Sequence, residues 1–176
     1  RTMASPFDWS LAEISARLAD WRLRARELIE EALARHDPSL NAYKTWAPDF
    51  ALRQADAADA ALAAGKRLGA LQGIPVSIKD LYGVEGLPTF AGSPRELPTR
   101  WRHEGPLVRA LRSQNAVIMG KAHTVEFAFG GLGINAHWPT PWNPQDRMVH
   151  RSPGGSSRGA GVTLGEDTAL IALRTD

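Results

Sequence analysis

The chain has 176 residues, of which 43% are hydrophobic, and this is long enough to bury a sizeable core. Its 21 Lys and Arg residues nearly balance its 19 Asp and Glu residues, so the net charge of +2 gives little support to a nucleic-acid partner. The absence of cysteine excludes disulfides and thiolate metal sites but fits either a reducing or an oxidising compartment. No apolar run approaches the length of a membrane span and the N-terminus has no apolar signal core, so we expect a soluble, cytoplasmic protein.

The first third of the chain is predicted to be helical. Ser10 and Glu13 match the Ser-x-x-Glu capping box, in which each side chain satisfies a free backbone N–H at the start of a helix. Apolar residues follow at helical spacing, and an alanine-rich run ends at Gly65, a glycine typical of a helix C-terminus. The expected elements are helices over residues 10–19, 24–35 and 47–64, with a short strand over residues 40–46.

A strand is predicted over residues 73–80, where apolar and other residues alternate with a period of two. Ser77 and Lys79 then project from the same face of this strand. Lys79 at the end of an apolar strand has two interpretations. It either extends its amine to solvent, or it is buried and carries out chemistry.

The second half of the chain predicts an α/β fold. A helix is expected over residues 104–113 and a buried strand over residues 116–119, separated by Asn115 in a left-handed conformation. Residues 82–102 and 120–144 are rich in glycine and proline and are expected to be irregular. We therefore predict a mixed, largely parallel sheet flanked by helices, with an N-terminal helical segment.

A glycine-rich turn precedes two adjacent serines, Ser156 and Ser157. Gly154 and Gly155 permit backbone conformations and close approaches that other residues resist, which suits a reactive site. Residues 131–136 match the dinucleotide fingerprint G-x-G-x-x-A, but the prolines that follow cannot open the required helix, so this motif is rejected.

No metal site is predicted from the five histidines, because none of them has the spacing of paired metal ligands. His123 and Glu126 are three residues apart and could share a site.

Two segments together resemble the amidase signature family. Residues 73–80, Gly-Ile-Pro-Val-Ser-Ile-Lys-Asp, are followed by a threonine and a Gly-Ser pair within residues 89–93, as in that family. Residues 153–161, Pro-Gly-Gly-Ser-Ser-Arg-Gly-Ala-Gly, resemble its glycine- and serine-rich motif. Further matches lie between these segments in the family's order: Gly120-Lys121, Glu126-Phe127-Ala128 and Asn143-Pro144.

The resemblance implies an amidase that uses a Ser–cis-Ser–Lys triad. Lys79 matches the catalytic lysine, Ser156 matches the serine after a cis peptide bond, and Ser157 matches the position beside it. Thr175 and Asp176 match the start of the segment that carries the nucleophilic serine, which is expected four residues after Asp176. The chain is then one partial family domain over residues 1–176, with a helical part (10–65) and an α/β part (73–176).

This chemistry needs no metal or organic cofactor. Lysine becomes a competent base once burial among apolar side chains lowers its pKa, which is ordinarily about 10.4. A hydroxyl both donates and accepts a hydrogen bond, so Ser156 can relay a proton between Lys79 and the nucleophile. The expected partner is a small-molecule amide, and a homodimer is possible. Nucleic acid and membrane are not expected.

Other interpretations of the sequence stay open. Ser77 and Lys79 could form a dyad complete within the chain. The chain could instead be a non-catalytic binding or scaffold fragment, or belong to a tRNA-dependent amidotransferase. Arg158 and Arg174 replace small residues of the family motifs, and their side chains either project outward or crowd the loop.

Overall fold

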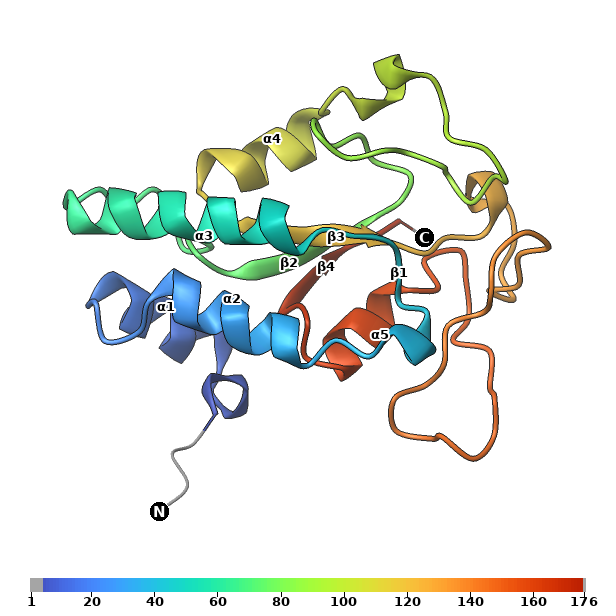
Figure 1. The fold of residues 1–176 in the computed structure, drawn as a ribbon, viewed down its shortest axis with the longest axis horizontal. Helices are drawn as coiled ribbons and strands as arrows, with labels where there is room; N and C mark the ends of the chain where they lie inside the picture. The colour runs from blue at the N-terminus through green and yellow to red at the C-terminus, as the bar shows by residue number, and fades with distance from the viewer. Residues whose placement is uncertain (1–4, 176) are drawn as a thin grey trace.

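The computed structural model describes residues 5–175, which form a four-stranded sheet with helices on both sides (Figure 1). The helices are α1 (Leu11–Ala19), α2 (Ala25–Ala34), α3 (Pro48–Ala63), α4 (Pro106–Ser113) and α5 (Ala160–Gly165). The strands are β1 (Tyr43–Trp46), β2 (Pro75–Lys79), β3 (Val117–Ala122) and β4 (Ile171–Leu173). Short 3-10 helices cover Pro6–Asp8, Pro38–Leu40, Thr99–Arg102 and Glu126–Ala128.

The sheet has the strand order β1-β3-β2-β4. β2 runs parallel to both β3 and β4, and β1 runs antiparallel to β3, so the predicted mixed, largely parallel sheet is confirmed. Ala122 pairs with Tyr43 on one side and with Lys79 on the other. The last residue of β2 therefore lies in one row with the first residue of β1, at the same edge of the sheet.

Strand β2 is buried on both faces. Val76 and Ile78 pack in a hydrophobic cluster that includes Val108 of α4. Ser77 points to the opposite face, where its hydroxyl lies 2.8 Å from the Thr163 hydroxyl of α5. Because side chains alternate along a strand, Lys79 shares the α5 face with Ser77. Figure 1 shows α4 and α5 on opposite sides of the sheet.

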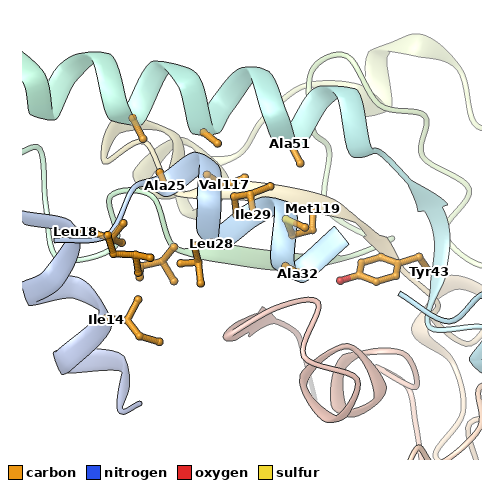
Figure 2. Close-up of a cluster of buried hydrophobic side chains, with 14 of the residues drawn as sticks. Ile14, Leu18, Ala25, Leu28, Ile29, Ala32, Tyr43, Ala51, Val117 and Met119 are labelled. Atoms are coloured by element: carbon orange, nitrogen blue, oxygen red, sulfur yellow. The ribbon is translucent and has the colours of Figure 1, made fainter. Parts of the chain in front are cut away.

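A second hydrophobic cluster joins the N-terminal helices to the sheet (Figure 2). Ala51, Ala55 and Ala58 of α3 recur at helical spacing and are fully buried. Their small side chains let α3 pack closely on α2 and β3. The cluster reaches β3 through Val117 and Met119. The alanine-rich run that predicted a helix therefore also forms a packing surface.

The predicted helices of the first half are found within one residue of their expected bounds. Ser10 Oγ accepts the Glu13 N–H at 3.2 Å, but the Glu13 carboxylate pairs with Arg17, so the capping box is only half formed. The strand expected over residues 40–46 starts later, because Asn41 takes a left-handed conformation with φ 52° after a 3-10 turn.

The predicted elements of the second half are also found, with changed ends. Helix α4 begins at Pro106, since proline suits the first turn of a helix, and Asn115 has φ 55° as expected. Strand β3 continues three residues past the predicted Met119. The pattern gave no prediction for α5 and β4, which are six and three residues long and too short for a clear period.

Candidate active site

The site is centred on the amine of Lys79 at the end of β2. The residue is 1% exposed, so the interpretation of a lysine that extends to solvent is wrong. Nζ lies 2.6 Å from Ser156 Oγ and 2.6 Å from Thr175 Oγ1. The fold thus brings together residues separated by 77 and 96 positions in the chain.

The turn before α5 holds Ser156 in place. Gly154 has φ +80°, a left-handed conformation that favours glycine. A Cβ on Gly155 would lie 2.7 Å from both Gly130 O and Gly133 N, so this close approach also requires glycine. The peptide bond between Gly155 and Ser156 is cis. Ser156 is 7% exposed, and its hydroxyl faces Lys79.

Ser157 joins this turn to the chain that leaves β4. Its hydroxyl donates to Thr175 O at 2.6 Å and accepts the Thr175 N–H at 3.2 Å. These two bonds fix the Thr175 backbone where its side chain reaches Lys79. Asp176, which matches the start of the segment expected to carry the nucleophile, lies outside the described residues.

A buried ion pair lies directly after the end of β2. Asp80 follows Lys79 directly, and its carboxylate lies 3.1 Å from Lys121 Nζ, with both side chains at most 1% exposed. Lys121 also donates to Thr89 Oγ1 at 3.1 Å. Burial raises the pKa of Asp80 and lowers that of Lys121, and their mutual attraction opposes both shifts. These three residues belong to the segments that resemble the amidase signature family, but the sequence does not predict that they contact one another.

Arg158 neither projects outward nor crowds the loop, because it folds into the interior and is 1% exposed. Its guanidinium donates to Gly133 O at 3.4 Å and Trp138 O at 3.3 Å, and one Nη lies 3.4 Å from His123 Nδ1. His123 and Glu126, which could have shared a site, have separate partners. Glu126 instead lies 3.4 Å from His137.

The burial of His123 makes the stability of the chain sensitive to acid. Burial first, and then the charges of Arg158 and Lys44, lower the pKa of His123 from 6.5 to about 3. Below about pH 6.5 the unfolded chain takes up a proton at this imidazole that the folded chain does not, so folding free energy is lost as the pH falls. We expect the free energy of unfolding to fall by about 2 kcal/mol between pH 8 and pH 5 through this group.

Denaturant unfolding of the chain and of its His123→Asn variant at both pH values measures this effect. The asparagine carbonyl can replace Nδ1 as an acceptor but does not titrate, so the variant should lose about 2 kcal/mol less on acidification. An equal loss in the two proteins would contradict the assignment.

The remaining sequence predictions concern other groups. The Ser77 hydroxyl is bonded to Thr163, an arrangement that differs from the Ser77–Lys79 dyad. Arg174 is exposed, and its carbonyl accepts from the Tyr82 hydroxyl at 3.5 Å.

Within residues 5–175 no group of three or more His, Cys, Asp or Glu side chains could hold a metal ion. In the same part of the chain, no helix has the length and apolar character needed to cross a membrane.

Comparison with known proteins gives consistent matches. The model of the Amidase family matches residues 27–176. A 2-amino-5-chloromuconic acid deaminase of Comamonas testosteroni is 55% identical over 170 residues, which cover 95% of this chain and 37% of that protein. A glutamyl-tRNA(Gln) amidotransferase subunit from Acidothermus cellulolyticus is 35% identical over 93% of this chain and 33% of its own length.

Solved structures agree with these matches. A native peptide amidase from Stenotrophomonas maltophilia superposes with a TM-score of 0.82 at 31% identity, over 95% of this chain and 36% of that protein. The chain therefore spans a little over a third of the length of the relatives it matches. By the match over residues 27–176, this chain belongs to the amidase family.

Proposed function

We propose that an enzyme containing this chain hydrolyses amide or related C–N bonds through a Ser–cis-Ser–Lys triad. The observation that carries the proposal is the 2.6 Å contact between Lys79 Nζ and Ser156 Oγ, both buried and next to the Gly154–Gly155 turn. A base, a relay hydroxyl and a glycine-rich turn in contact are the parts that serine-dependent acyl transfer requires.

In the proposed reaction, Lys79 acts as a neutral amine. It accepts the proton of Ser156 while Ser156 accepts the proton of the nucleophilic serine, which the resemblance locates four residues after Asp176. The nucleophile attacks the carbonyl carbon, and the proton returns through Ser156 to the departing nitrogen. Water then releases the acyl group by the same route, and the triad regains its starting protonation.

The sequence relationship guides the proposed substrate class. The relative at 55% identity is named for deaminating 2-amino-5-chloromuconic acid, whereas the amidotransferase subunits are 30 to 37% identical. This difference favours hydrolysis of a small-molecule C–N bond with release of ammonia over a role in a tRNA-dependent amidotransferase. Residues 1–176 are proposed to form part of one catalytic domain. A cytoplasmic location and a homodimeric state remain predictions from the sequence.

We expect the 176-residue chain by itself to release no ammonia from amides, because the proposed nucleophile is not among its residues. The test incubates the purified chain, and a protein that continues it through the rest of the family domain, with a serine-reactive fluorophosphonate and with simple amides. Only the longer protein should turn over amides, and its labelled serine should lie after residue 176.

Peptide mapping of the adduct separates this proposal from the rival dyad. A label on Ser77, or clear turnover by the 176-residue chain, would overturn the triad. Ligand binding without turnover in the longer protein would favour the scaffold interpretation.

A further inference from the structure

A lysine that the mechanism does not use lies at the same edge of the sheet as Lys79. Lys44 follows Tyr43 at the start of β1, and Tyr43, Ala122 and Lys79 form one row across β1, β3 and β2. Neighbouring strands are about 4.8 Å apart, so the backbone of Tyr43, the residue before Lys44, is about 10 Å from that of Lys79. Lys44 itself lies at an irregularity of β1, one residue from this row.

The amine of Lys44 lies among aromatic rings. It is 3.9 Å from the ring centre of Phe90 and 4.0 Å from that of Trp138. Among residues 5–175, no carboxylate lies within 4.0 Å of it. The nearby carboxylate of Asp80 is already bound to Lys121. Within the described chain, the half-buried Lys44 therefore presents a positive charge that lacks a direct counterion.

Arg158 is a second cation, and the groups around it compensate its charge only weakly. Its three polar contacts are all 3.3–3.4 Å long, and its buried Nε has no hydrogen-bond partner among the described residues. No carboxylate of residues 5–175 pairs with it. Burial lowers the pKa of Arg158 to about 10, which leaves it charged at neutral pH. An unpaired buried charge is costly, so an anion nearby would be bound favourably.

The two cations act on the same region. Burial, and then the charges of Arg158 and Lys44, lower the pKa of His123, so His123 is neutral and adds no charge of its own at neutral pH. Arg158 also follows Ser156 by two positions, on the turn that carries the proposed relay. Next to that turn the protein therefore holds two positive charges, while the nearby pair of Asp80 and Lys121 is neutral in sum.

We propose that Lys44 and Arg158 recognise a carboxylate of the substrate, so that the enzyme acts on C–N bonds of molecules that also carry an acid group. Lys44, which is partly exposed, makes the direct contact, and the buried Arg158 adds to the positive potential. This inference rests on the proposed function for the reaction, but the recognition of a carboxylate can be measured separately.

The test compares succinamate with butyramide, which has the same chain length and no carboxylate, in a protein that continues this chain through the family domain. We expect kcat/KM to be about tenfold higher for succinamate in the unchanged enzyme. Lys44→Met should remove this preference, because KM should rise far more for succinamate than for butyramide. Arg158→Met should act in the same direction, and its thermal unfolding reports whether it folds.

Lys66→Met is the matched control, because Lys66 is an exposed lysine after α3 and its loss removes the same net charge. It should keep the preference for succinamate. Equal rates on both amides in the unchanged enzyme, or equal losses on both in Lys44→Met, would overturn the inference.

If neither amide is hydrolysed, that result counts against the proposed function alone. Carboxylate recognition is then tested by binding measurements. Calorimetry should then show that succinate binds more tightly than neutral succinamide, and that Lys44→Met loses this difference. Absence of succinate binding by the unchanged protein would refute carboxylate recognition whatever the reaction.

Discussion

Replacing Lys79 by methionine is expected to lower kcat for amide hydrolysis by about 10³-fold in an enzyme that contains this chain, with little change in KM. Methionine fills a similar volume but cannot accept a proton. The Lys79 amine contacts Ser156 Oγ at 2.6 Å, so its loss removes the only base that the proposed relay includes. Steady-state kinetics measures the effect, and circular dichroism with thermal unfolding checks the fold.

The Lys79→Arg variant distinguishes a role of Lys79 as a base from a role as a fixed positive charge. Arginine keeps a positive charge but does not deprotonate in proteins, so this variant should be as impaired as Lys79→Met. Near-normal turnover by folded Lys79→Met, or full activity in Lys79→Arg, would show that Lys79 is not the base.

Ser156→Ala is expected to lower kcat by a similar factor of about 10³, because the proton would have no hydroxyl through which to pass. The change removes one oxygen atom from a residue that is 7% exposed, so the fold should persist. Phosphonate labelling of the nucleophile should also slow strongly, since activation of that serine depends on the same relay.

Ser77→Ala is the matched control for Ser156→Ala. Ser77 is also buried, at 1% exposure, and its hydroxyl is hydrogen-bonded at 2.8 Å, but to Thr163 rather than to Lys79. We expect Ser77→Ala to retain activity within about threefold, because its loss affects packing and not the relay. If Ser77→Ala abolished activity while Ser156→Ala retained it, the dyad of Ser77 and Lys79 would replace the proposed triad.

Local sequence patterns were sufficient to predict the elements in which one residue type recurs regularly along the chain. The alanine-rich run predicted α3. The period-two pattern of residues 73–80 predicted β2, with Ser77 and Lys79 on one face. Such periods report directly which face of an element is buried. Helix α5 and strand β4 escaped prediction because they are short, and because β4 is defined by its pairing with β2 rather than by its own sequence.

Charged residues were the least predictable from sequence. Arg158 was expected either outside the loop or crowding it, yet it is 1% exposed beneath the chain around Gly133 and Trp138. Lys121 and Asp80 are 41 positions apart, and only the parallel pairing of β2 with β3 brings them to 3.1 Å. A charge takes its environment from all segments packed against it, and one sequence does not encode those contacts locally.

By itself, the sequence determined the helices, the main strands and the identity of the residues that resemble the amidase triad. Only the tertiary structure decided the distances among them: it brought Lys79, Ser156 and Thr175 into contact and, within residues 5–175, left Lys44 and Arg158 without acidic partners. The physical reason is that periodicity acts within a few residues, whereas proximity and burial arise when distant segments pack and exclude water together.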